Sequence, residues 1–378
     1  MVKKDVNIAG AGIAGLTAAI NLARDGRRVR VYERGPDVGT RFNNDFQGLE
    51  NWSTEKDVLE VLDGYGIKTD FFYKPFKEAD IICGERHVIK SPGGRVGVYM
   101  VRRGSAEGCL DLALKRQALE AGAEIVFNKK VEEKDVDIVA TGPRSFSGVV
   151  SGITGEAGWL AGEAIRQSGE AGSQACEAPR ADMVMIMLDN DCAPKGYVYM
   201  AVIEGNITLA SVVMEDFANA KRYFARALEK VRSFYGLDVK NPRPFGGTGN
   251  FFLPEAYSKD GNLYVGERAG FQDYLFGFGM RYAFASGYYA AKSIATGSDY
   301  EAMVRRFLLP VKKASLVNRF VFERLGGNYK RLVSGWAGAK DPVEFLKRWY
   351  GLGLPKRMLY PFAVRWYRKK AGSFKIQS

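Results

Sequence analysis

The sequence has few of the residues on which several classes of enzyme depend. Its 378 residues include a single histidine, His87, and four cysteines that form no CxxC pair. Because metal centres and Ser-His-Asp hydrolases draw on these side chains, we expect neither a metal site nor a catalytic triad. We expect His87 to be an ordinary polar side chain. The scattered cysteines favour a reducing, cytoplasmic location.

Long apolar runs are also missing. No stretch reaches the roughly 20 apolar residues needed to cross a bilayer, and nothing that resembles a signal peptide opens the sequence. The composition, 46% hydrophobic and 26% charged, is typical of a folded protein. A single core stops growing at about 250–300 residues, so the length favours two cooperating lobes.

The net positive charge of the chain comes from its last fifth. The net charge is +12, but residues 305–375 alone carry 18 Lys or Arg and three acidic residues. Trp, Tyr and Phe are interleaved with these cations, a pairing typical of surfaces that lie on anionic membranes. The alternative is a helical cap whose aromatic residues pack on the main body. Nucleic acid is a weaker interpretation, because no recognised binding motif accompanies the charge.

The first forty residues predict a βαβ unit. Residues 6–9 and 29–32 are short apolar runs typical of buried strands, and residues 13–23 have helical periodicity. Between them stands Gly10-Ala11-Gly12-Ile13-Ala14-Gly15, which fits the pattern GxGxxG. An acidic residue, Glu33, follows the second strand.

This pattern favours binding of a dinucleotide. Gly10 permits a tight turn, Gly12 lets the backbone approach a pyrophosphate, and Gly15 allows close packing of helix on sheet. The N-terminus of the helix supplies N–H groups for the phosphates. Glu33 is positioned to accept hydrogen bonds from a ribose.

Further elements can be assigned from the same signals. We expect Ser105 to cap a helix that ends at Gly122, and strands at residues 125–127, 136–140 and 263–265. Alternating apolar and polar residues over 181–210 predict an antiparallel sheet. Residues 217–235 have a helical pattern.

A second glycine-rich stretch runs through Gly266-Glu267-Arg268-Ala269-Gly270, Gly277-Phe278-Gly279-Met280 and a helix containing Ser286-Gly287. With the VDIVATG of residues 136–142 and the helix of residues 111–123, it resembles FAD-dependent oxidoreductases related to geranylgeranyl reductase and p-hydroxybenzoate hydroxylase. A helix that begins near Met280 would also direct its positive end at the flavin, where negative charge grows on reduction.

The resemblance implies an α/β fold: a doubly wound Rossmann-like FAD-binding domain, an antiparallel-sheet substrate domain and a helical C-terminal region. The expected divisions are residues 1–75, 101–180 and 256–300 for FAD binding, 76–100 and 181–255 for the substrate lobe, and 301–378 for the basic aromatic region.

The resemblance also implies a set of site residues for a noncovalent FAD. No catalytic residue is assigned. The expected cofactor-binding residues are Gly10, Gly12, Ile13, Ala14, Gly15, Glu33, Arg34, Arg41, Arg103, Thr141, Gly142, Gly266, Glu267, Gly277, Gly279 and Met280. The expected substrate-cavity residues are Tyr197, Tyr199 and Phe276.

The chain departs from the family's pattern at several points. Glu267 stands where the family has Asp, and Tyr274 where it has Pro. The loop of residues 41–47 lacks the cysteine that geranylgeranyl reductases often carry near the flavin, and their YxWxFP motif survives only in part from Tyr197. The cofactor is therefore better supported than the substrate.

The leading hypothesis is reduction of C=C bonds in an isoprenoid lipid. A monooxygenase or dehydrogenase of an apolar small molecule is the first alternative, and a binder of prenyl lipids or prenylated proteins that does not use flavin is another. A second nucleotide-binding motif is missing, so we expect electrons from transiently bound NAD(P)H or from a protein such as reduced ferredoxin. The basic surface would suit an acidic electron-transfer partner.

Overall fold

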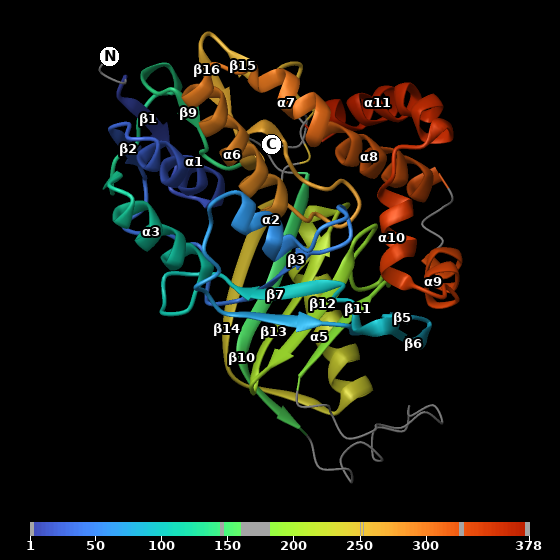
Figure 1. Cartoon of the computed structure of the whole chain (residues 1–378). Helices are drawn as coiled ribbons and strands as arrows, with labels where there is room; N and C mark the ends of the chain where they lie inside the picture. Colours follow the sequence, from blue (N-terminus) through green and yellow to red (C-terminus); the bar gives the residue numbers. More distant parts are fainter. Residues whose placement is uncertain are drawn as a thin grey trace.

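A computed structural model describes residues 4–143, 147–159, 182–249, 251, 253–324 and 329–374. Three sheets and a set of C-terminal helices make up this part of the chain (Figure 1). The Rossmann-like sheet has the strand order β15-β16-β9-β1-β2-β8 and is parallel except for β15. Its strands are β1 (Val6–Ala9), β2 (Val29–Tyr32), β8 (Glu124–Val126), β9 (Ile138–Val139), β15 (Ser258–Lys259) and β16 (Asn262–Tyr264).

Three helices accompany this sheet: α1 (Ile13–Arg24), α3 (Leu110–Glu120) and α6 (Met280–Thr296). Ten of the twelve residues of α1 are buried, because it packs against β-strands on one side and against α3 and α6 on others. The contact between α1 and α6 is close. A Cβ at Gly287 would lie 2.3 Å from the carbonyl oxygen of Ala14. This contact brings the two glycine-rich segments together.

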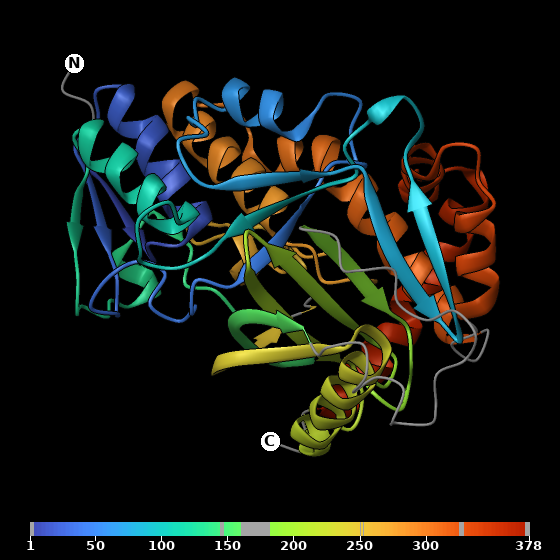
Figure 2. The ribbon, with the colours of Figure 1, turned by 90° about the horizontal axis from the view of Figure 1, so that it is seen from below.

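The part of the chain expected to be the substrate lobe forms a seven-stranded sheet with the order β14-β10-β13-β12-β11-β5-β6, which we call the substrate sheet. Neighbouring strands are antiparallel except β11 and β5. Helix α5 (Ala220–Tyr235) packs through Ala227 and Val231 on the face turned away from the Rossmann-like part (Figure 2). The strands are β5 (Glu78–Cys83), β6 (Glu85–Lys90), β10 (Gly148–Trp159), β11 (Met183–Met187), β12 (Tyr197–Ile203), β13 (Asn206–Val213) and β14 (Leu237–Gly249).

A small sheet connects the two larger parts. It consists of β3 (Phe46–Glu50), β7 (Val98–Arg102) and β4 (Tyr73–Phe76), all antiparallel. Helix α2 (Val58–Gly64) follows β3 and is capped by Asp57, whose carboxylate accepts the Leu59 N–H. One core cluster joins this sheet to the substrate lobe through Phe46, Met100 and Ala201.

The C-terminal region is helical. Its helices are α7 (Tyr300–Phe307), α8 (Leu309–Arg324), α9 (Tyr329–Ala337), α10 (Pro342–Tyr350) and α11 (Leu354–Phe374). They lie along one side of the molecule, beside both the Rossmann-like part and the substrate sheet (Figures 1 and 2). None of the helices in the described ranges is long and apolar enough to cross a bilayer.

The α/β fold class is confirmed, and several local predictions differ from the structure. The helix expected from Ser105 begins at Leu110 after Cys109, because Gly108 has φ +76°, which a helix does not accept. The expected FAD-binding range 101–180 contains β10, which instead pairs with β13 and β14 in the substrate sheet. Residues 160–180 of that range, with Cys176, lie outside the described residues.

Candidate active site

Two glycines of the first glycine turn have no room for a side chain, whereas a third has free space beside it. Gly10 has φ +101°, and a Cβ there would lie 2.3 Å from the Ala140 oxygen; one at Gly15 would lie 2.0 Å from the Gly10 oxygen. Gly12, which precedes α1, has φ −84° and no atom within 4 Å of an added Cβ. The fold therefore requires Gly10 and Gly15, whereas Gly12 faces open space.

The start of α1 is suited to an anion. The N–H groups of a first helical turn have no partner inside the helix, and Ile13, Ala14 and Gly15 form that turn. No acidic residue occupies it. A pyrophosphate beside Gly12 would meet these donors and the positive end of the helix.

Glu33 lies beside this turn. Its two carboxylate oxygens accept the N–H groups of Ala11 at 2.9 Å and Gly35 at 2.8 Å, which fixes the side chain at the end of β2. Each oxygen keeps a second acceptor position for a ribose hydroxyl. The neighbouring Arg34 is exposed.

The end of β9 forms a second wall. Because β1, β2 and β9 are parallel neighbours, their carboxyl ends meet at one edge of the sheet, which is where ligands bind in this kind of fold. Thr141 and Gly142 follow β9 there, and Gly142 has φ +79°. The structure thus brings these two predicted residues to the edge that carries the glycine turn.

The second glycine-rich segment closes the groove. Gly266 has φ +59° and donates its N–H to the Ser286 hydroxyl at 2.9 Å. Gly279 immediately precedes α6, and Met280 is its first residue. Together with Glu267 and Gly277, both of these residues line a cavity, so the start of α6 faces it.

The two predicted arginines of this region have different surroundings. Arg41 lines the cavity, whereas Arg103 is buried behind it. The Arg103 guanidinium donates to both carboxylate oxygens of Asp111 at 2.8 Å and lies over the ring of Phe42. Although burial opposes it, this pairing keeps the pKa of Asp111 below its ordinary value. The contact of Arg103 with the cofactor stays a prediction, and in this structure its guanidinium pairs with Asp111.

The cavity has a volume of about 340 Å³ and mostly apolar walls. The predicted substrate residues Tyr197, Tyr199 and Phe276 all line it. The Tyr197 hydroxyl donates to the Phe276 carbonyl oxygen, and the two rings meet edge to face with centroids 5.9 Å apart. Burial raises the pKa of both tyrosines, so their hydroxyls stay protonated.

Part of the cavity wall was missed from the sequence. Helices α9 and α10 contribute Trp336, Leu346, Trp349 and Tyr350. The spacing of Leu346 and Tyr350 by four residues, with both buried, could have indicated a buried helix face. It does not indicate which surface that face covers.

A buried carboxylate lies in the loop before α6. Asp273 is 2% exposed, accepts the Phe276 N–H, and lies close to the Tyr350 hydroxyl. Its other oxygen has no hydrogen-bond partner among the described residues. Burial raises the pKa of Asp273 to about 6.

The described part of the chain contains no group of three or more His, Cys, Asp or Glu side chains arranged to hold an ion. His87 lies in β6, and Cys83, Cys109 and Cys192 are buried.

The segment that contains the first glycine turn is similar to known proteins. Residues 8–50 match a family described as an NAD(P)-binding Rossmann-like domain. Thiamine thiazole synthase of Pyrococcus horikoshii is 33% identical over 78 residues, and that of Pyrococcus abyssi is 32% identical over the same length. These matches cover 21% of this chain and 31% of each relative, so they concern less than a third of those enzymes.

Several solved structures resemble this chain over nearly its whole length. A geranylgeranyl bacteriochlorophyll reductase-like protein from Thermoplasma acidophilum has TM-score 0.61 and 18% identity, covering 97% of this chain and 98% of its own. A flavin-dependent brominase has 0.64 and 17%, covering 97% and 99%. A probable FAD-dependent monooxygenase from Pseudomonas aeruginosa has 0.56 and 17%, covering 87% and 98%. This chain therefore shares its overall fold with these solved structures.

Proposed function

We propose that the chain is an FAD-dependent oxidoreductase that reduces C=C bonds of an isoprenoid lipid. The observation that carries this proposal is the cavity of about 340 Å³, whose walls are mostly aliphatic and aromatic and which reaches the start of α6. Such walls favour an apolar substrate over a charged one. One of the structural relatives is described as geranylgeranyl reductase-like, which also supports it.

The groove fits an FAD molecule. The open space at Gly12 and the start of α1 suit the pyrophosphate, and Glu33 suits a ribose. The backbone of Gly277 and Gly279, with the positive end of α6, suits the edge of the isoalloxazine ring. When bound, FAD would supply the hydride transfer that protein side chains lack.

The protein's own residues would position the substrate and exclude water. Tyr197 and Tyr199 stay neutral, and Tyr197 commits its hydroxyl to the Phe276 carbonyl, so it holds the loop before α6 against the substrate sheet. Leu346 and Trp349 close the cavity from the other side. A dry, apolar enclosure of this kind protects a reduced cofactor from solvent.

A monooxygenase or dehydrogenase of an apolar small molecule is the second candidate. It is favoured by the likeness to a flavin-dependent brominase and a probable FAD-dependent monooxygenase, since one fold hosts several reactions. The electron donor, NAD(P)H or a reduced ferredoxin, stays a prediction.

The deciding experiment is the visible spectrum of the purified chain before and after anaerobic reduction, followed by assays of the reduced protein. Noncovalent FAD with anaerobic saturation of a geranylgeranyl lipid would support the proposal. Oxygen-dependent NAD(P)H consumption with a hydroxylated product would favour the second candidate. Failure to hold FAD under any loading condition would contradict both and favour a binder of prenyl groups.

The open glycine provides a sharper test of the cofactor site. Gly12→Ala places a methyl group where no protein atom lies, so we expect unchanged thermal unfolding of the FAD-free protein and FAD affinity at least about tenfold weaker, from loss of one close phosphate approach. Gly64→Ala is the matched control, because Gly64 also has no atom within 4 Å of an added Cβ but lies on α2. Equal FAD affinity of the two variants would contradict the placement of the pyrophosphate beside Gly12.

A further inference from the structure

Helix α11 exposes large apolar side chains to solvent. Leu354, Met358 and Phe362 are 72%, 68% and 64% exposed, the highest values for any large apolar side chain in the described ranges. Folded proteins bury most such side chains, and a contiguous exposed group of them marks an interaction site.

These side chains lie on one face of the helix. Residues 354, 358 and 362 are four apart, so they are successive neighbours along a single face. The exposed Arg365 and Lys369 continue that face toward the C-terminus. We call these five residues the α11 face. The opposite side is buried through Ala363 and Tyr367, which pack in a core cluster with α8.

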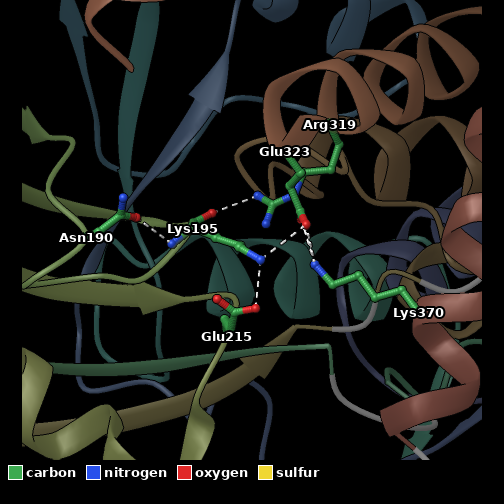
Figure 3. Close-up of polar contacts among 6 residues, drawn as sticks. All are labelled: Asn190, Lys195, Glu215, Arg319, Glu323 and Lys370. Atoms are coloured by element: carbon green, nitrogen blue, oxygen red, sulfur yellow. Dashed lines mark hydrogen bonds and ion pairs between the residues drawn. The ribbon is translucent and has the colours of Figure 1, made fainter. Parts of the chain in front are cut away.

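The helix is firmly attached to the body. In its second half, Lys370 pairs with the buried carboxylate of Glu323, which also binds Arg319 of α8 and pairs with Lys195 from the turn before β12 (Figure 3). The Tyr367 hydroxyl donates to the Phe251 carbonyl.

The first turn of α11 is attached as well. There, Lys356 donates to the Trp349 carbonyl at the end of α10. The α11 face is therefore presented by a helix held at both ends.

We propose that the α11 face docks on the surface of an anionic lipid bilayer. The α11 face carries Arg365 and Lys369, and helix α11 has no acidic residue. This charge complements the negative potential of anionic headgroups, by about 1 kcal/mol for each basic residue near the surface. The three apolar side chains would enter the boundary between headgroups and acyl chains, as in other interfacial helices. A second copy of the chain would oppose two such basic helices, and like charges destabilise that contact.

Docking would bring the end of α10, which contributes to the cavity wall, close to the bilayer. Trp349, which lines the cavity, is tied to Lys356 in the first turn of α11. A lipid substrate of the proposed enzyme resides in such a bilayer. The docking itself requires no flavin, so it stands or falls independently of the proposed function.

The test is co-sedimentation of the full chain with vesicles of phosphatidylcholine alone and of phosphatidylcholine mixed with phosphatidylglycerol. We expect binding to the mixed vesicles that weakens as salt is added. Each of Leu354→Ser, Met358→Ser and Phe362→Ser should weaken that binding about tenfold. Arg365→Gln and Lys369→Gln should each weaken it about fivefold.

The matched control is Leu119→Ser, because Leu119 is 47% exposed on α3, at the other side of the molecule (Figure 1). It should bind as the unaltered chain does. Thermal unfolding verifies that every variant is folded.

Absence of binding to the mixed vesicles, or equal loss for Leu119→Ser and Phe362→Ser, would overturn the proposal. A dimer in sedimentation equilibrium that Phe362→Ser dissociates would assign the α11 face to a second copy instead.

Discussion

The cofactor groove and the apolar cavity meet at the loop before α6, yet they are built differently. The groove depends on close backbone contacts: Gly10, Gly15 and Gly287 allow parts of the chain to approach where even a Cβ would collide with a carbonyl oxygen. The cavity is lined by side chains from two sheets and two C-terminal helices. Substitution of the glycines in a site built from backbone contacts disrupts the fold. Substitution of the side chains that line a cavity can alter the cavity's shape, and with it the preferred substrate, while the fold is kept.

The largest effect should come from the backbone site. Gly15→Ala puts a methyl carbon 2.0 Å from the Gly10 oxygen, so we expect the free energy of unfolding to fall by about 3 kcal/mol. Urea denaturation would measure this. Gly64→Ala is again the control, and equal stability of the two variants would contradict the claim that α1 packs this tightly.

The loop before α6, where the two regions meet, should show a pH dependence that the glycine turn does not. Burial raises the pKa of Asp273 from 3.8 to about 6, so the folded state holds this proton more tightly than the unfolded state. Stability from this group is full below about pH 4 and is lost as the pH rises through about 6, by about 3 kcal/mol. Urea denaturation at a series of pH values should show this loss in the unaltered chain and not in Asp273→Asn. Parallel curves would show that Asp273 keeps an ordinary pKa.

A smaller effect would locate the junction of the two regions. Tyr197→Phe removes the hydroxyl that donates to the Phe276 carbonyl but keeps the edge-to-face rings. We expect a loss of about 1 kcal/mol in the free energy of unfolding, measured by thermal unfolding. Tyr223→Phe serves as the control, because the Tyr223 hydroxyl also donates a hydrogen bond, to Asp216, but at an exposed position. Equal losses would show that burial of the Tyr197 contact adds nothing.

The difference between the two regions also explains what could be predicted from sequence. Backbone sites need glycine at fixed spacing, so Gly10, Gly12, Gly15 and the segment before Met280 were readable. Strand β1 was predicted with the bounds that the structure has.

Residues whose side chains line a cavity show no comparable spacing in the sequence. The contributions of Trp336 and Tyr350 depend on how α9 and α10 pack, and the burial of Arg103 depends on its pairing with Asp111. Such long-range contacts are not encoded in a local pattern. From the sequence alone, the basic tail could be either a helical cap packed on the body or a membrane-binding surface. Its helix α11 buries one side, while the α11 face remains exposed.

The contact between α1 and α6 has a consequence for synthesis of the chain. Strand β1 lies between β2 and β9, β16 follows on the far side of β9, and Gly287 of α6 rests on Ala14. During synthesis, part of the apolar surface of α1 therefore stays uncovered until α6 has been made. Contacts between such distant segments form slowly, and surface left uncovered meanwhile is prone to aggregation. A nascent chain halted before α6 should consequently bind chaperones that a chain halted after α7 releases.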